Sequence, residues 1–120
     1  MEERNELAER LLSFSIRIIK FLRTLSDTTE YKVIKYQLIK SATSSGANYD
    51  EAQGASSKAD FHNKIRISLK EMRESNYWLM VTIGVLEDSK VNTKELNYLI
   101  KESVELKNIL GKIAFKTRRE

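Results

Sequence analysis

The chain has 120 residues, of which 21 are basic and 17 acidic, so its formal net charge at pH 7 is +4. With 41% apolar and 32% charged residues, the composition is typical of a folded, soluble helical protein and excludes a disordered chain. The chain contains no cysteine, which excludes disulfides, thiolate metal sites and cysteine nucleophiles. It also contains no proline, so long uninterrupted helices are allowed. The mildly basic balance permits a nucleic-acid partner without requiring one.

No segment of the sequence is expected to enter a membrane. The N-terminus, Met1 to Arg4, is not followed by the apolar core of a signal peptide. The most apolar stretch, Trp78 to Leu86, is far shorter than the about 20 residues that a spanning helix needs. We therefore expect a cytoplasmic protein with no membrane partner.

Three helix-start signals divide the chain into four segments. In each, a short oxygen-bearing residue precedes a carboxylate by three positions, which is the pattern of a capping box. The signals are Asp27-Thr28-Thr29-Glu30, Ser57-Lys58-Ala59-Asp60 and Asn92-Thr93-Lys94-Glu95. They predict helices over about 5–25, 28–54, 58–87 and 93–116.

Three of the four segments carry an apolar stripe whose members recur every three or four residues, which is typical of a helix with one buried face. The stripes are Leu7, Leu11, Phe14, Ile18, Leu22 and Leu25; Phe61, Ile65, Ser68, Met72, Leu79, Ile83 and Leu86; and Leu96, Leu99, Ser103, Leu106, Leu110 and Ile113. Short connections favour antiparallel neighbours. The predicted fold is all-α, an up-down-up-down antiparallel four-helix bundle in a single domain over residues 1–120.

The second segment differs from the others because it contains seven small residues in a row, from Ser41 to Ala47. Such a run has poor helix propensity, so keeping it in a helix favours close approach by another backbone. Its core stripe is Ile34, Leu38, Ala42, Ser45, Tyr49 and Ala52, and a polar stripe beside it is Gln37, Ser41, Ser44, Asn48 and Glu51. The polar stripe is either a solvated face or a partly buried network that fixes register between helices or subunits. The packing or interface candidates are Gln37, Ser41, Ser44, Gly46, Ala47, Asn48 and Glu51, with Glu71, Glu74 and Trp78 from the third segment as partners.

Catalytic and metal chemistry find no support in the sequence. A di-iron bundle needs two Glu-x-x-His motifs, but the chain has one histidine, His62, and Ala59 stands three residues before it. The serine-rich run lacks the strand-turn-helix context of a nucleophile elbow, and the glycines form no phosphate-binding loop. We expect no enzymatic activity, no cofactor and no metal.

Basic residues form two clusters, one at each end of the predicted bundle. They provide either ordinary solvated helix faces or phosphate contacts to RNA or DNA, which are salt-sensitive and independent of base sequence. Aromatic residues fall mostly at core spacings, so a base-stacking platform is not predicted. The nucleic-acid candidates are Arg17, Lys20 and Arg23 at one end and Lys58, Lys64, Lys112, Lys116, Arg118 and Arg119 at the other.

The central stretch from Gln37 to Ala52 resembles the signature of the bacterial four-helix-bundle protein family, also called large-subunit rRNA intervening-sequence proteins. The resemblance continues through Ser57 to Phe61 and Lys70 to Leu79 and covers most of the chain. Two positions depart from the family pattern, since Lys40 stands where Arg is usual and Ser45 where a branched apolar residue is usual. The positions that match the motif are Gln37, Leu38, Ser41, Ser44, Asn48, Glu51, Ala52, Phe61, Glu71, Glu74, Tyr77 and Trp78.

This resemblance implies a small cytoplasmic bundle, commonly a ring-like homopentamer, with no catalytic residues to carry over. The family is named for genes located inside rRNA intervening sequences, which is a genomic location and not an activity. A related branch, the accessory proteins of diversity-generating retroelements, consists of basic pentameric bundles that bind nucleic acid and a reverse transcriptase. We therefore expect a non-enzymatic, self-assembling protein with an accessory nucleic-acid-binding role. The alternative is a scaffold for a protein partner with no nucleic-acid role.

Overall fold

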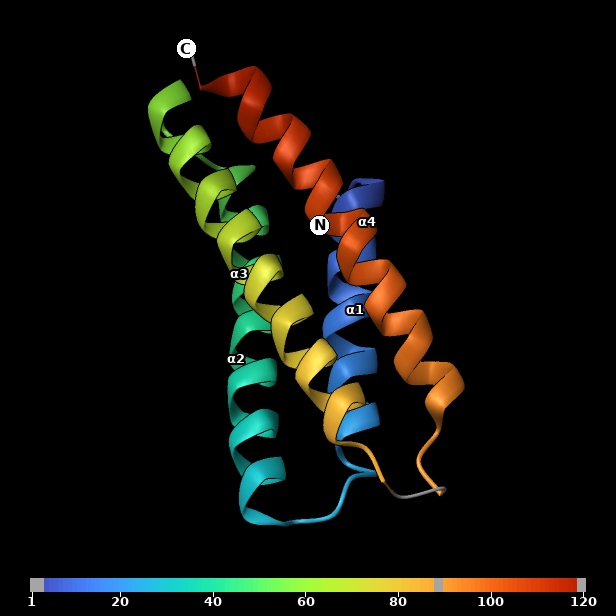
Figure 1. Ribbon diagram of the computed structural model, residues 1–120. Helices are drawn as coiled ribbons and strands as arrows, with labels where there is room; N and C mark the ends of the chain where they lie inside the picture. The colour runs from blue at the N-terminus through green and yellow to red at the C-terminus, as the bar shows by residue number, and fades with distance from the viewer. Residues whose placement is uncertain (1–3, 88–89, 119–120) are drawn as a thin grey trace.

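The computed structural model describes residues 4–87 and 90–118 and shows an antiparallel bundle of four helices (Figure 1). The helices are α1 Glu6–Leu22, α2 Thr29–Ala52, α3 Lys58–Val85 and α4 Thr93–Thr117. Each helix contacts the next along the chain, and α4 returns beside α1. The all-α, up-down-up-down fold predicted from the sequence is therefore confirmed.

The helix starts follow from side-chain caps. Thr28, Ser57 and Asn92 each accept a hydrogen bond from the backbone N–H three residues on, at 3.3, 3.0 and 3.0 Å, which satisfies an otherwise unpaired donor. The first of the three predicted signals is displaced by one residue, because Thr28 and not Asp27 is the cap of α2. Asn5 caps α1 in the same way, with 2.8 Å between its Oδ1 and the backbone nitrogen of Ala8.

Three helix ends lie inside the predicted ranges, and that of α2 is Ala52, two residues before its predicted end. Helix α1 ends at Leu22 rather than near residue 25, although Leu25 remains buried in the turn that follows. Helix α3 ends at Val85, two residues before the predicted end. Apolar periodicity fixes which residues are buried but not where the helical hydrogen bonds stop.

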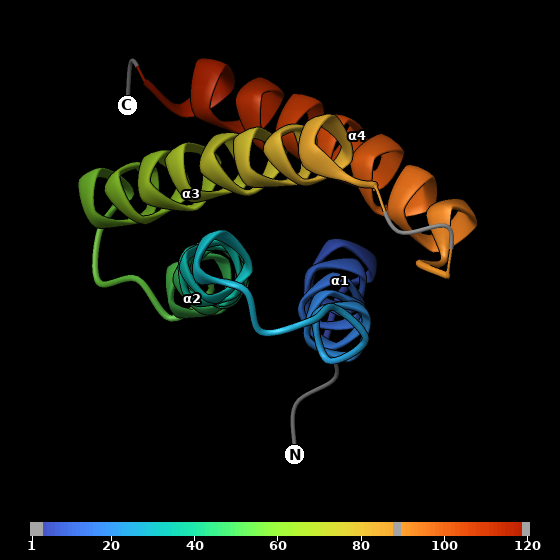
Figure 2. The same cartoon turned by 60° about the horizontal axis from the view of Figure 1, so that its bottom comes forward.

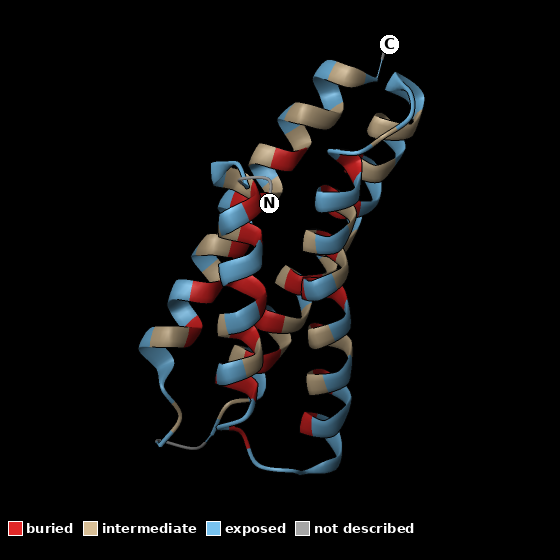
Figure 3. Cartoon of the chain, turned by 180° about the vertical axis from the view of Figure 1, so that it is seen from behind, coloured by how far each residue is buried: buried red, intermediate tan, exposed pale blue. Residues whose placement is uncertain are grey.

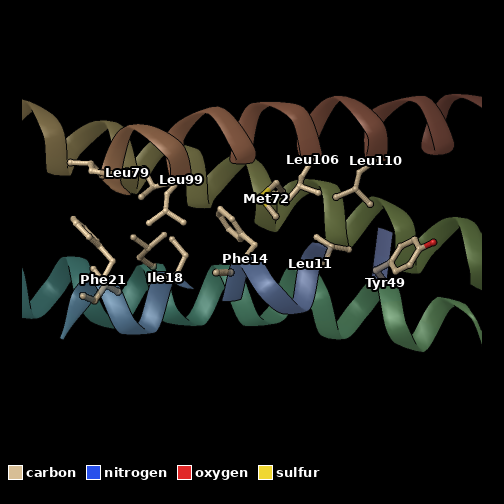
Figure 4. Close-up of a cluster of buried hydrophobic side chains, with 14 of the residues drawn as sticks. Leu11, Phe14, Ile18, Phe21, Tyr49, Met72, Leu79, Leu99, Leu106 and Leu110 are labelled. Atoms are coloured by element: carbon tan, nitrogen blue, oxygen red, sulfur yellow. The ribbon is translucent and has the colours of Figure 1, made fainter. Parts of the chain in front are cut away.

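The bundle consists of two layers, with α1 and α2 in one and α3 and α4 in the other (Figure 2). Buried residues lie on the facing sides of the helices, and exposed residues cover the outer sides (Figure 3). A close-up of the core (Figure 4) shows side chains of both layers pointing toward one another, with Phe14 of α1 near Met72 of α3 and Ile18 of α1 near Leu99 of α4. The predicted stripes supply this core; of their members, Leu7, Phe61, Ile83, Leu86 and Ile113 are only half-buried.

The small residues of α2 pack within the bundle, against α3. Ser45 and Ser68 exchange hydrogen bonds, each hydroxyl donating to the other residue's backbone carbonyl at 2.8 and 2.7 Å. Farther along the same contact between α2 and α3, the hydroxyls of Ser41 and Ser75 lie 2.8 Å apart. A serine hydroxyl reaches the backbone of a neighbouring helix only when the two helices approach closely, so the run from Ser41 explains the α2–α3 contact.

The same run also faces α1. The Ser15 hydroxyl donates to the Ala42 carbonyl at 3.1 Å, and a Cβ added to Gly46 would lie 3.6 Å from the Cβ of Leu11. Ala47, in contrast, is exposed. The candidates Ser41 and Gly46 are therefore contacts between helices of one chain, and Ala47 lies on the surface.

Of the two alternatives for the polar stripe of α2, a buried polar contact with α3 is found at Ser41, and its partner is Ser75 rather than a carboxylate of Glu71 or Glu74. Asn48 donates to the Ser44 carbonyl within α2 at 2.9 Å, and the exposed Glu51 pairs with Lys64. Glu74 accepts a hydrogen bond from the indole N–H of Trp78 on its own helix, at 3.1 Å. Among the described residues, the polar contacts that join α2 to the centre of α3 come from serines, because only short side chains fit this narrow seam.

Candidate nucleic-acid interface

Arginines of α1 hold all three carboxylates of α4. The Arg10 guanidinium contacts Glu102 through two nitrogens, at 2.7 and 3.1 Å, and Glu105 at 2.9 Å. Arg17 binds Glu95 in the same two-pronged manner, at 2.7 and 3.0 Å. Hydrogen bonding to these carboxylates raises the pKa of Arg10 and of Arg17 above their ordinary values. Such paired contacts are the strong form of a salt bridge, so all three carboxylates of α4 are engaged within the chain and the two arginines offset two of their three negative charges.

Two of the predicted nucleic-acid candidates are engaged in intramolecular ion pairs. Arg17 binds Glu95, and its guanidinium also lies 3.7 Å from the centre of the Tyr98 ring. Lys64 lies 2.8 Å from a carboxylate oxygen of Glu51, whose hydrogen bond raises the pKa of Lys64. Neither charge is free for a phosphate unless its carboxylate partner is displaced.

The remaining candidates lie in different parts of the molecule. Lys20 and Arg23 are exposed near the C-terminal end of α1, and Lys58 is exposed at the start of α3. The guanidinium of Arg118 lies 4.3 Å from the centre of the exposed Phe115 ring. Arg119 lies outside the described residues.

The lysines of α4 have no carboxylate partner among the described residues. Lys94, Lys101 and Lys112 are separated by 7 and 11 residues, which places them on one face of the helix. Lys107 is half-buried, and Lys116 is exposed near the end of the helix. With all three glutamates engaged by arginines of α1, these five lysines give the outer side of α4 a positive charge.

A second row of basic residues, on α3, was missed by the sequence analysis. Arg66, Lys70 and Arg73 are exposed and spaced by four and three residues, so they share one helix face. With Asn63, Ile67 and Leu69 they line a shallow hollow on α3, and within the described chain they form no ion pair. Their spacing of four and three in the sequence is a signal of one shared helix face, and it lies outside the two basic clusters predicted at the ends of the bundle.

Helices α3 and α4 lie side by side in one layer (Figure 2), so the two basic rows belong to one side of the bundle. We call this the α3–α4 basic surface. Its residues are Arg66, Lys70, Arg73, Lys94, Lys101, Lys107, Lys112 and Lys116.

The opposite layer carries a groove between α1 and α2, which we call the α1–α2 groove. It has a volume of about 230 Å³ and is lined by Arg4, Ala8, Leu12, Ser15, Thr43, Gly46, Ala47 and Asp50. Leu12 and Ile16 of α1 are exposed, as is Tyr36 of α2, which shares a helix face with Thr43. The small residues of the run from Ser41 thus leave an apolar hollow on the outer side of α1 and α2.

The described residues do not assemble a metal site, since no three histidine, aspartate or glutamate side chains come together there. His62 is half-buried at the start of α3, and its Nδ1 lies 2.7 Å from the hydroxyl of Thr117 near the end of α4. This contact confirms that the start of α3 lies beside the end of α4. In the described parts of the chain, no helix is long and apolar enough to cross a membrane.

Comparison with known proteins identifies the family. The model of the 23S rRNA-intervening sequence protein family matches residues 3–112, so the chain belongs to that family. A solved structure of a protein with unknown function from the S23 ribosomal protein family of Bacteroides thetaiotaomicron is 32% identical in sequence. It superposes with a TM-score of 0.78 and covers 90% of this chain and 97% of its own. No curated protein matches the chain.

Proposed function

We propose that this member of the 23S rRNA-intervening sequence protein family is a non-enzymatic, self-assembling bundle that binds RNA or DNA through its α3–α4 basic surface. One observation carries the nucleic-acid part: Arg10 and Arg17 engage every carboxylate of α4 in ion pairs, while the lysines of that helix have no partner among the described residues. A surface whose cations are unpaired and whose neighbouring anions are held in ion pairs attracts phosphates. The resemblance to the basic accessory proteins of diversity-generating retroelements supports the same proposal.

The binding surface can be tested with two variants that remove the same charge from different places. Arg66→Gln combined with Arg73→Gln removes two positive charges from the α3–α4 basic surface. Lys20→Gln combined with Arg23→Gln removes two from α1, where the neighbouring Arg17 is already paired with Glu95. Fluorescence anisotropy with a labelled oligonucleotide of about 20 nucleotides measures the affinity of each at about 50 and 200 mM salt.

We expect the α3 variant to bind more weakly. Its salt dependence should also become shallower, by about one unit of slope for each phosphate that the variant no longer neutralises. The α1 variant should change the affinity much less. Equal weakening by both variants would mean that net charge alone attracts the nucleic acid. An absence of binding at low salt would overturn the proposal.

Self-assembly is proposed to use the α1–α2 groove, and the family resemblance favours a homopentamer. The groove is supported as the interface by Leu12, which lines it, and by the exposed Ile16 and Tyr36 on the same two helices, because exposed apolar side chains gathered on one side of a protein mark a contact site. Leu12→Glu with Ile16→Glu should reduce the mass measured by light scattering. Met80→Glu, at an exposed apolar residue of α3, should leave the mass unchanged.

The alternative function is a scaffold for a different protein, and the same apolar groove favours it. This alternative predicts a chain that stays monomeric at all concentrations, does not bind nucleic acid, and no longer binds its partner when Leu12 is replaced by Glu. Light scattering with and without RNA therefore separates the two functions in one experiment.

A further inference from the structure

Tyr77 extends the basic row of α3. It follows Arg73 by four residues, Lys70 by seven and Arg66 by eleven, so all four lie along one side of the helix. At a rise of about 1.5 Å per residue, the backbone of Tyr77 lies about 6 Å beyond Arg73 and about 16 Å beyond Arg66 along the helix axis. Tyr77 is 60% exposed, so an aromatic ring stands in solvent at the end of a row of unpaired cations.

The Tyr77 ring is supported from one side. It meets the ring of Trp78 edge to face, with 5.3 Å between the ring centres and 79° between the planes. Trp78 is in turn fixed by packing against the core and by the hydrogen bond from its Nε1 to Glu74. A ring held in place loses little conformational freedom when a flat group stacks on it.

We propose that Tyr77 is a base-stacking residue and that the ligand of the α3–α4 basic surface is single-stranded nucleic acid. This inference rests on the proposed nucleic-acid-binding function. The phosphates would lie along Arg66, Lys70 and Arg73, and a base would stack on Tyr77. Only an unpaired base offers its flat face, because the bases of a duplex are stacked on one another.

The arrangement of the helices favours a single strand over a duplex. Reading a duplex with a helix requires the helix to enter a major groove about 12 Å wide, and one helix with its side chains already measures about 10–12 Å across. Helix α4 lies alongside α3 over much of its length (Figure 2), so α3 cannot enter such a groove alone. A single strand needs only an open surface.

Three variants test the role of the ring. Tyr77→Phe retains the ring and removes the hydroxyl, whereas Tyr77→Leu retains apolar bulk and removes the ring. Tyr36→Leu is the matched control, since Tyr36 is 64% exposed and belongs to α2 in the other layer; because Tyr36 belongs to the proposed self-assembly face, light scattering first verifies that this variant has the mass of the parent. The ligands are an oligo(U) strand of about 20 nucleotides and a duplex with the same number of phosphates, both at about 50 mM salt.

Stacking on an aromatic ring contributes about 1–3 kcal/mol per base, so Tyr77→Leu should weaken binding of the single strand about 5- to 150-fold. Tyr77→Phe and Tyr36→Leu should bind it as the parent does. The duplex should bind more weakly than the single strand and be insensitive to Tyr77→Leu.

Trp78 provides a second readout, because it is the only tryptophan of the chain and its ring contacts Tyr77. A base stacked on Tyr77 should change the emission of Trp78 as the strand is titrated. The change should persist in Tyr77→Phe and disappear in Tyr77→Leu, and the duplex should produce none.

The outcomes separate this inference from the function on which it rests. If Tyr77→Leu binds the single strand as the parent does, or if the duplex binds equally well, base stacking is wrong. In that case, weakening by Arg66→Gln with Arg73→Gln would still support an electrostatic nucleic-acid surface. If neither ligand binds at low salt, both proposals fail.

Discussion

Replacing Gly46 by alanine should make the protein more stable. Gly46 lies in the interior of α2, opposite α1, and an added Cβ would meet the Leu11 Cβ at 3.6 Å and the Leu11 carbonyl oxygen at 3.7 Å. These are ordinary van der Waals distances, so one methyl group fits without moving either helix. Alanine is also favoured over glycine in a helix interior by about 1 kcal/mol.

We therefore expect Gly46→Ala to raise the free energy of unfolding by about 1 kcal/mol. For a chain of this length, that corresponds to about 4 °C in Tm. Gly111→Ala is the matched control, because it lies inside α4 and an added Cβ there meets no atom within 4 Å. The stability of Gly111→Ala should rise only through the higher helix propensity of alanine. Gly46→Leu adds bulk beyond the Cβ and should destabilise the protein by about 1–3 kcal/mol through overpacking.

Urea unfolding followed by circular dichroism measures all three variants. The protein concentration must be the same throughout, because self-association adds to apparent stability. The reasoning is refuted if Gly111→Ala is stabilised while Gly46→Ala is destabilised by about 1 kcal/mol or more. That result would place the backbones of α1 and α2 closer together than the Leu11 distances indicate.

Three further predictions concern polar contacts. A double-mutant cycle of Ser41→Ala and Ser75→Ala should give a coupling energy of about 0.5–1.5 kcal/mol in urea unfolding, from the direct contact of the two hydroxyls; a coupling near zero would contradict that contact. Arg10→Met should destabilise the protein by about 1–3 kcal/mol, because it leaves a mostly buried Glu102 carboxylate unpaired, and an unchanged urea midpoint would argue against the pair. The hydrogen bond from Lys35 lowers the pKa of Asp27 below its ordinary 3.8, so its contribution to stability is present above pH 3.8 and is lost as pH falls through the lower, folded value. Asp27→Asn should thus be less stable than the parent at pH 7 and equal to it well below that value, and a difference that persists in strong acid would be inconsistent with this pairing.

The fold was readable from the sequence because its determinants are local. Capping residues such as Ser57 and Asn92 act on backbone groups three positions away, and the core stripes follow the period of a single helix. The partners of the small-residue run were harder to predict from the sequence. Ser45 bonds to Ser68, 23 positions along the chain, and that pairing depends on which face of α3 meets α2.

The basic candidates were predicted less well, for the same physical reason. The sequence around Arg17 shows only a basic residue among its neighbours. In the structure its charge is neutralised by Glu95, 78 positions away, and this contact exists only because α4 returns beside α1. Lys64 is engaged by Glu51 across the α2–α3 connection. The row on α3 that includes Arg66 and Arg73 was accessible, since its spacing of four and three lies within one helix. Local patterns thus identify cations, and the topology decides which of them remain free.

The pairing of α1 with α4 also determines how the two proposed functions fit on one bundle. Because Arg10 and Arg17 face α4, the outer side of α1 is left with apolar residues such as Leu12 and Ile16, which adjoin the α1–α2 groove. The α3–α4 basic surface lies on the other layer. Copies that associate through α1 and α2 would therefore keep the α3–α4 basic surface exposed on every subunit. One long strand could then contact several subunits at once, so association would strengthen nucleic-acid binding without any new contact within a subunit.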